Sequence, residues 1–310
     1  MADIRIGIAG WAYKDWKGIV YPEARKNAPP PVEYLAQFFD LIEINTSFYG
    51  HIKPSQAKLW SQQAASANPQ FLFTLKANRA FTHSPIATVE STSASTIRFQ
   101  MDDVRLAREA YDALASEGRL GALLLQFPIS FRNTPENRDH LDRLIRLFAE
   151  YPLAIEVRHS SWSDAATLKY LTQVGVALCN IDQPLLGRAV RPADHVTSRI
   201  GYIRLHGRRY DQWFDPEKPS DRYDYLYSTQ ELASWKGRIE NVARKAETTF
   251  VVANNHFQGK APANALELKH MITGQKVKAP RILVDHYPRL QDITEVTESP
   301  IPLTLFDRAH

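Results

Sequence analysis

The chain has 310 residues, of which 44% are hydrophobic and 23% are charged, a composition that excludes disordered, collagen-like and coiled-coil proteins. Its 38 Lys and Arg residues against 34 Asp and Glu give a net charge of +4. So small an excess does not by itself indicate a nucleic-acid-binding protein. The single cysteine, Cys179, excludes an intramolecular disulfide. Neither a signal-peptide pattern nor a long apolar run is visible, so we expect a soluble, cytoplasmic protein without membrane contact.

Short apolar runs rich in Ile, Leu, Val and Phe recur down the chain, at 4–10, 41–46, 71–77, 121–127, 153–159, 176–182, 201–207 and 249–255. Each run is apolar on both faces, which is typical of a strand buried on both sides. Segments with helical periodicity separate most of them, at 31–39, 54–67, 102–118, 136–148, 164–174, 231–246 and 263–272. Ser163 is the predicted N-cap of the fifth of these helices.

This alternation predicts an α/β protein of the TIM (β/α)8 barrel type, because parallel strands need crossover helices. A doubly wound open sheet is the alternative, but no GxGxxG pattern follows an early strand. We predict a barrel domain over 1–272 and a C-terminal tail over 273–310 that packs on the barrel or extends from it. Two longer segments, 79–100 and 207–228, would leave the C-terminal ends of strands, where barrel enzymes place their active sites.

Polar side chains two residues apart share a strand face near the ends of five predicted strands. These pairs are Glu43 with Asn45, Thr74 with Lys76, Glu156 with Arg158, Asn180 with Asp182, and Arg204 with His206. Their neighbours Ile42, Ile44, Ile155, Val157, Ile203 and Leu205 should face the helices, so the polar pairs should face the barrel interior or its mouth. A self-neutralising ion-pair network is one explanation. A functional site is favoured, because Val, Ile and Leu usually fill barrel interiors.

Three kinds of side chain would form this site. Aromatic rings suited to stacking on a sugar or base follow the first two strands, at Trp11, Tyr13, Trp16 and Tyr49. Cations suited to a phosphate or carboxylate are Lys76, Arg158, Arg204 and Arg208. Candidate acid, base or metal-binding groups are Glu43, Glu156, Asp182 and His206, with His206 as a proton shuttle and His256 as a further metal ligand. Gln126, Asn254 and Asn255 add polar groups, and Cys179 should point toward the helices.

Seven segments in this order resemble the YecE-like family, also called domain of unknown function 72. They are GIAGWAYKDWKGIVYP, LIEINTSFYG, FLFTLKANRAFTH, LGALLLQFP, AIEVRHSSW, YIRLHGR and NNHFQGKAPANAL. The resemblance implies a TIM barrel and adds His83 to the candidate ligand-binding residues, but it implies no reaction. The chain departs from the family pattern at Ala9 and Ala12, where Ser is more common, and at Ile129, where a second Pro is.

Three functions fit this pattern. The first is an enzyme, a hydrolase or isomerase, acting on a small anionic or sugar-like ligand that could be phosphorylated. The second is a metal-dependent phosphodiester or nucleic-acid enzyme, which would use a divalent metal as cofactor. The third is a non-catalytic ligand-binding or interaction module. The sequence specifies neither the oligomeric state nor the metal.

Overall fold

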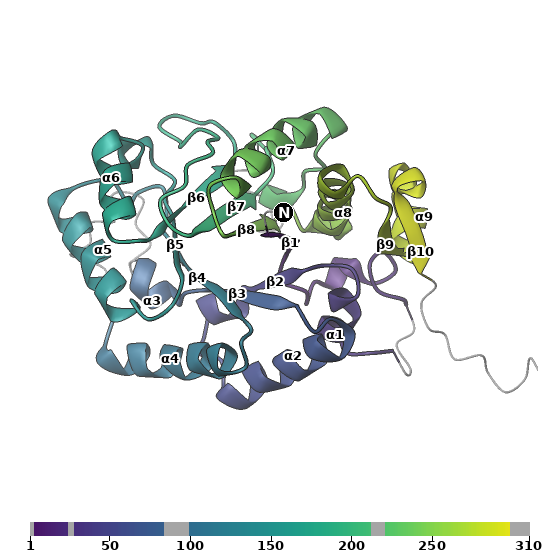
Figure 1. Ribbon diagram of the computed structural model, residues 1–310, viewed down its shortest axis with the longest axis horizontal. Coiled ribbons are helices and arrows are strands. Elements are labelled where there is room, and N and C mark those ends of the chain that lie inside the picture. Colours follow the sequence, from purple (N-terminus) through teal and green to yellow (C-terminus); the bar gives the residue numbers. More distant parts are fainter. Residues whose placement is uncertain (1–2, 24–27, 84–98, 212–220, 298–310) are drawn as a thin grey trace, which may run out of the picture.

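The computed structural model describes residues 3–23, 28–83, 99–211 and 221–297. Eight parallel strands close into a barrel in sequence order, as predicted (Figure 1). They are β1 (Asp3–Ala9), β2 (Leu41–Ile44), β3 (Leu72–Lys76), β4 (Leu120–Gln126), β5 (Leu153–Glu156), β6 (Ala177–Asp182), β7 (Ile200–Leu205) and β8 (Thr248–Ala253). The barrel closes where β1 pairs with β8 through six residues, from Asp3 opposite Thr248 to Ile8 opposite Ala253.

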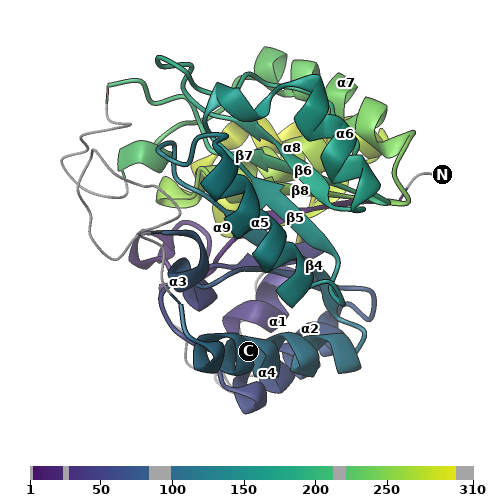
Figure 2. The same ribbon diagram turned by 90° about the vertical axis from the view of Figure 1, so that its left-hand side faces the viewer.

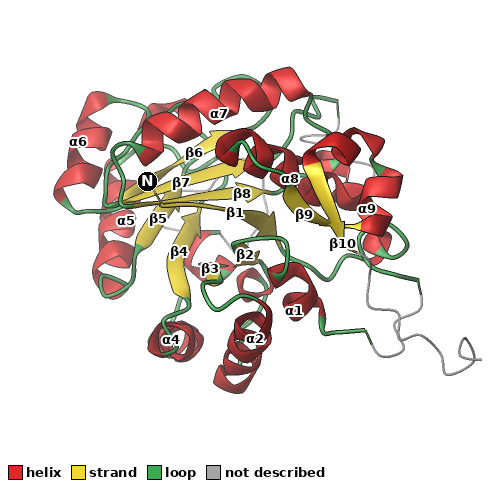
Figure 3. Cartoon of the chain, turned by 45° about the vertical axis from the view of Figure 1, so that its right-hand side comes forward, coloured by secondary structure: helices red, strands yellow, loops and turns green. Residues whose placement is uncertain are grey.

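Helices surround the barrel, as the α/β alternation predicts (Figure 3). They are α1 (Pro31–Ala36), α2 (Pro54–Ala67), α3 (Arg79–Thr82), α4 (Met101–Ser116), α5 (Pro135–Leu147), α6 (Ala165–Gln173), α7 (Thr229–Ala243) and α8 (Lys260–Thr273). Helices α5 and α6 cover the side that carries β4 to β6 (Figure 2). The described segment 183–199 joins β6 to β7 without a helix. Asp164, not Ser163, caps α6, because its carboxylate accepts the Thr167 N–H at 2.6 Å.

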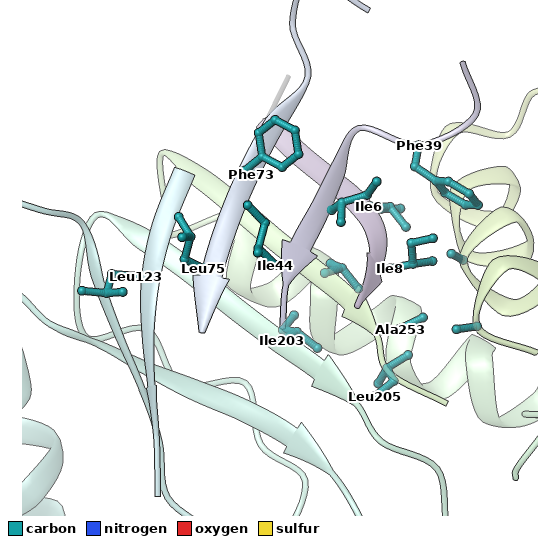
Figure 4. Close-up of a cluster of buried hydrophobic side chains, with 14 of the residues drawn as sticks. Ile6, Ile8, Phe39, Ile44, Phe73, Leu75, Leu123, Ile203, Leu205 and Ala253 are labelled. Carbon is teal, nitrogen blue, oxygen red and sulfur yellow. The ribbon is translucent and has the colours of Figure 1, made fainter. Parts of the chain in front are cut away.

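Two separate apolar layers hold the fold. The outer layer lies between strands and helices and contains Ile42, Ile44, Ile155, Val157, Ile203 and Leu205, as predicted; Figure 4 shows part of it. The inner layer fills the barrel lumen with Ala9, Leu41, Ala122, Leu124, Ala154, Ala177, Cys179, Ile181, Ile200, Tyr202, Phe250 and Val252. Burial of these side chains, at roughly 25 cal/mol per Å² of apolar surface, is the main source of stability.

The side chains of strand β6 face the opposite way from the prediction. Cys179 and Ile181 belong to the inner layer, so Asn180 and Asp182 point outward, since successive side chains alternate across a strand. Asn180 donates from Nδ2 to the His195 carbonyl at 2.9 Å and accepts the His195 N–H at 2.8 Å. The helix-free 183–199 segment therefore supplies the polar partners that Asn180 needs outside the barrel.

The C-terminal segment packs against α8. It contains β9 (Val277–Pro280), α9 (Arg281–His286) and β10 (Thr294–Thr297), and the two strands pair in parallel beside α8 (Figure 1). Arg289 forms an ion pair with Glu267 of α8 at 2.6 Å, and the Tyr287 hydroxyl donates to the Gln258 carbonyl at 2.7 Å. Among the described helices, none combines the length and the apolar character that crossing a bilayer requires.

Candidate functional site

A buried ion-pair network lies in the lumen at the C-terminal ends of the strands. Arg204 of β7 places Nη2 2.6 Å from Glu43 Oε1 and Nη1 2.5 Å from Glu156 Oε2, thereby joining β2, β7 and β5. Arg204 is 2% exposed and both glutamates are 0% exposed. Burial acts to raise the pKa of Glu156, but Arg204, His206 and Arg158 hold it well below the usual range. Glu156 is therefore a carboxylate at neutral pH.

His206 continues this network toward Asn254. Its Nε2 lies 3.2 Å from Glu156 Oε1, and its Nδ1 lies 2.9 Å from Asn254 Nδ2. This arrangement fits the neutral tautomer with the proton on Nε2. Burial lowers the pKa of His206 to about 3, well below the range expected of a proton shuttle at neutral pH. The ring therefore fixes the orientation of Asn254 at all pH values near neutrality.

Lys76, the last residue of β3, lies beside this network but forms no ion pair with any described residue. The carboxylate of Glu43 is paired with Arg204 and not with Lys76. Its Nζ lies 3.6 Å from the centroid of the Phe48 ring. Burial, followed by the nearby Arg204 guanidinium, lowers the pKa of Lys76 to about 7.

A cavity of about 420 Å³ opens above the network. Its walls come from the C-terminal ends of the strands and the loops that follow them, and they contain Trp11, Tyr13, Asn45, Tyr49, Trp60, Lys76, Gln126, Arg158, Arg204, Tyr223, Asn254 and His256. The volume lies in the ordinary range for small-molecule sites. Nine of the predicted site residues thus line one cavity: Trp11, Tyr13, Asn45, Tyr49, Lys76, Gln126, Arg158, Arg204 and Asn254.

Aromatic contacts shape the cavity wall. Tyr13 stacks on His256 with ring centroids 4.0 Å apart and planes 11° apart. The Tyr13 hydroxyl donates to the Ala9 carbonyl at 2.7 Å, and burial raises its pKa. Trp11 meets Trp60 edge-to-face with centroids 4.9 Å apart. These contacts hold the rings in place and provide flat apolar surface against which a ligand can pack.

Several predicted site residues lie elsewhere. Trp16 is fully buried and donates from Nε1 to the His256 carbonyl at 2.7 Å, so it packs the barrel rim and has no surface for a ligand. Asn255 is also fully buried and donates to Asn264 Oδ1 at 2.9 Å. His83 does not line the cavity. Its ring packs edge-to-face against the Phe48 ring with centroids 5.0 Å apart, and burial lowers its pKa to about 3.

Asp182 and Arg208 form a second ion-pair cluster outside the lumen. Arg208 Nε lies 2.9 Å from Asp182 Oδ2, and its Nη1 lies 3.0 Å from Glu231 Oε1 of α7. Burial raises the pKa of Asp182. Because β6 turns Asp182 outward, neither residue lines the lumen cavity. The prediction that both would serve the site at the barrel mouth is wrong for this cavity.

The sequence pattern did not name three residues of the site. Tyr202 donates to Glu43 Oε2 at 2.8 Å and lies 2.8 Å from Thr74 Oγ1. The two-residue spacing from Arg204 would have placed it on the inner face. Trp60, on the helix α2, has no such signal, whereas Tyr223 lies in the 207–228 segment that the sequence places at the active-site end of the barrel. His256 was considered only as a metal ligand. Trp213, Phe214 and the Ser/Thr-rich 91–96 segment lie outside the described residues.

In the described part of the chain, no group of three His, Cys, Asp or Glu side chains is placed to hold a metal ion. Of the five predicted ligands, Glu156 and His206 are in contact, Glu43 is held by Arg204, and Asp182 lies outside the lumen. His256 stacks on Tyr13.

A second cavity of about 440 Å³ lies outside the barrel, under the helix-free segment between β6 and β7, and is lined by residues that include Asn180, Arg188, Arg191 and His195. The lumen cavity is the better candidate site, because the charged strand-end side chains of β3, β5 and β7 line it.

The fold and this cavity define a TIM-barrel protein with a polar pocket at the C-terminal ends of its strands. The chain belongs to the family described as Protein of unknown function DUF72, whose model matches residues 5–286, which confirms the resemblance found in the sequence. It is similar to the UPF0759 protein YunF of Bacillus subtilis, with 24% identity over 279 residues, covering 87% of this chain and 94% of YunF.

Two solved structures share the fold. A DUF72 family protein from Thermotoga maritima is 30% identical, with a TM-score of 0.74, and the match covers 87% of this chain and 99% of that one. A DUF72 family protein from Enterococcus faecalis is 22% identical, with a TM-score of 0.72, and the match covers 87% and 95%.

Proposed function

We propose that this protein is an enzyme that acts on a small anionic or sugar-like molecule bound in the lumen cavity. The observation that carries the proposal is the enclosed charge at the cavity floor and wall. Three basic side chains, Lys76, Arg158 and Arg204, lie with two carboxylates, Glu43 and Glu156. The cavity lining contains these three basic side chains and, among the described residues, no carboxylate, because Glu43 and Glu156 are bonded to the arginines and do not line it. This lining favours a carboxylate or phosphate group on the ligand.

Arg158 is the residue best placed to contact the anionic group. Its Nε lies 2.9 Å from Glu156 Oε1, its side chain is 18% exposed, and it lines the cavity. Arg204 is more deeply buried between its two glutamates, so it anchors the network and holds Glu156 in place. The aromatic wall formed by Trp11 and Tyr13 would pack against the carbon skeleton of the ligand. A hydrolase or isomerase reaction remains the class that we propose.

The test is a search for turnover with the full-length protein. The protein is incubated with a metabolite extract, and untargeted mass spectrometry follows which compounds decrease and which appear. We expect one anionic compound to be consumed and a product to accumulate. The Arg158→Gln variant should convert it at least about ten-fold more slowly, because it loses one charged hydrogen bond to the ligand. The Arg208→Gln protein, altered outside the lumen, is the matched control and should retain the activity.

Other outcomes would favour the other functions. An anionic compound that is retained but unchanged after long incubation would support a non-catalytic ligand-binding module. Binding of single-stranded nucleic acid with a steep salt dependence would support the nucleic-acid alternative. If the protein neither retains nor converts any small molecule, the proposal is overturned.

A further inference from the structure

Lys76 differs from the other basic groups of the site in its partners. Arg158 and Arg204 each have a carboxylate within 3 Å, whereas Lys76 has none among the described residues. The Nζ atom of Lys76 lies over the face of the Phe48 ring, 3.6 Å from its centroid. The Lys76 side chain also lines the cavity. An amine at the wall of a small-molecule pocket, without a carboxylate to hold it, can reach a bound ligand.

The groups around Lys76 favour its neutral form. Burial and the guanidinium groups of Arg204 and Arg158 act to lower its pKa, while the carboxylates of Glu156 and Glu43 act to raise it. Both carboxylates are bonded to Arg204, so the balance gives a pKa of about 7.

The remaining neighbours of Lys76 do not restore the positive charge on its amine. His83, behind Phe48, stays neutral because burial lowers its pKa to about 3. The Phe48 ring attracts a cation, but less strongly than a carboxylate would hold one. At neutral pH a large share of Lys76 is therefore the free amine, the form that acts as a nucleophile.

We propose that Lys76 is a nucleophile that forms an imine with the aldehyde or ketone group of a small anionic ligand in the lumen cavity. This inference rests on the proposed function, because it names the chemical class of the ligand at the same site. It predicts a carbonyl compound that also carries a carboxylate or phosphate, with Arg158 placed to hold that anionic group.

The covalent step balances without any other reactant. The Nζ lone pair attacks the carbonyl carbon, and the carbonyl π bond breaks to give an alkoxide. A proton moves from nitrogen to that oxygen to form a carbinolamine. Protonation of the hydroxyl then expels water, a C=N bond forms, and the nitrogen gives up its remaining proton to solvent or keeps it as an iminium ion. Hydrolysis reverses each step, so no oxidant or reductant is consumed.

The test uses glyoxylate, a small anionic aldehyde, as the probe. The full-length protein is incubated with glyoxylate and sodium cyanoborohydride at pH 7, and peptide mass spectrometry measures how fast each lysine is carboxymethylated. Lys58, exposed on α2, is the internal control for an ordinary amine. We expect Lys76 to be labelled at least about ten-fold faster than Lys58, since an ordinary lysine is almost fully protonated at this pH.

The pH profile separates a reactive amine from mere accessibility. Labelling of Lys76 should level off above about pH 7, whereas labelling of Lys58 should keep rising toward pH 10. Arg158→Gln should slow the labelling of Lys76 by glyoxylate, and Arg208→Gln should not change it. Labelling of Lys76 no faster than that of Lys58, or a profile that rises to pH 10, would overturn the proposal.

The two proposals can fail separately. If the protein converts an anionic metabolite but Lys76 shows ordinary reactivity, the imine is wrong and the proposed function stands. If Lys76 is labelled rapidly but no metabolite is retained or converted, the amine is reactive as inferred and the proposed function is wrong.

Discussion

Arg204 and Arg208 lie four residues apart, and each is held between two carboxylates, yet their surroundings differ. Arg204 bridges Glu43 and Glu156 inside the barrel and is 2% exposed. Arg208 bridges Asp182 and Glu231 outside it, and its side chain is 28% exposed. Only the first cluster lies beneath a cavity, and that cavity also contains Lys76, which has no ion-pair partner among the residues that the structure describes. A charged strand end is therefore informative about function only when its side chain faces the lumen.

The largest expected difference between the two clusters is in stability. Arg204→Met would leave Glu43 and Glu156 buried without their shared cation, which should cost about 3–5 kcal/mol of unfolding free energy or prevent folding. Arg208→Met should cost less, about 1–2 kcal/mol, because the Glu231 side chain is 23% exposed and the buried Asp182, whose pKa burial already raises, can take up a proton. Urea unfolding of both variants at pH 7 measures the difference. Equal losses would mean that enclosure in the lumen does not distinguish the clusters.

Lys76→Met should change the pH dependence of stability on the alkaline side. The folded pKa of Lys76 is about 7 and the unfolded value is about 10.4, so between these values the unfolded chain binds more protons. Stability of the natural chain should therefore rise with pH across this window. With allowance for the partial exposure of the side chain, the rise is on the order of 1–3 kcal/mol.

The matched measurement is chemical unfolding at pH 7 and pH 10. Lys76→Met should be more stable than the natural protein at pH 7, and its unfolding free energy should lack this part of the rise between pH 7 and pH 10. Lys58→Met should keep the rise. A rise of the same size in Lys76→Met would show that the amine is charged in the folded protein near neutrality.

His206 should contribute to the pH dependence of the unfolding free energy below neutral pH. Its folded pKa is about 3 and its unfolded value about 6.5, so the unfolded state binds the extra proton between these values and stability falls as the pH falls. His206→Asn should reduce the slope of unfolding free energy against pH by about one proton, or roughly 1.4 kcal/mol per pH unit. Unfolding curves at pH 4, 5 and 6 measure this slope, and an unchanged slope would contradict a neutral buried ring.

The smallest effect is expected at the exposed rim. Tyr49 lines the lumen cavity but is 77% exposed, so Tyr49→Ala should change the unfolding free energy by no more than about 0.5 kcal/mol. It should weaken binding of the retained ligand by about five-fold, since an aromatic contact contributes about 1 kcal/mol. Tyr210→Ala, 50% exposed and outside the cavity, is the control. Calorimetric titration of both variants decides whether the rim contacts ligand.

The sequence predicted the barrel because its strands are apolar runs at regular spacing, and local pattern is enough for that. It also placed the polar faces of β2, β3, β5 and β7 correctly, because each has apolar partners that must meet helices. It failed at β6, where Cys179 and Ile181 are as apolar as any outward-facing pair. Only the helix-free 183–199 segment, a tertiary feature, provides polar partners for Asn180 outside the barrel.

The site was harder to predict residue by residue. Trp16 and Trp11 occur in the same aromatic segment, yet one is fully buried and the other lines the cavity, and nothing in the local pattern separates them. Which carboxylate pairs with which cation depends on distances across the lumen between strands far apart in sequence. The sequence therefore predicted Lys76, Arg158 and Arg204, which line the cavity, together with Arg208, which does not. It could not show that Lys76 has no ion-pair partner among the described residues.

The central claim is that the lumen cavity, and not the outer arginine cluster, binds a small anionic ligand. The most direct measurement incubates the natural protein, Arg158→Gln and Arg208→Gln with one metabolite extract and quantifies by mass spectrometry the small molecules that each retains after gel filtration. We predict that the natural protein and Arg208→Gln retain the same anionic compound and that Arg158→Gln loses it. Retention by Arg158→Gln together with loss in Arg208→Gln, or a natural protein that neither retains nor converts any compound of the extract, would contradict the claim.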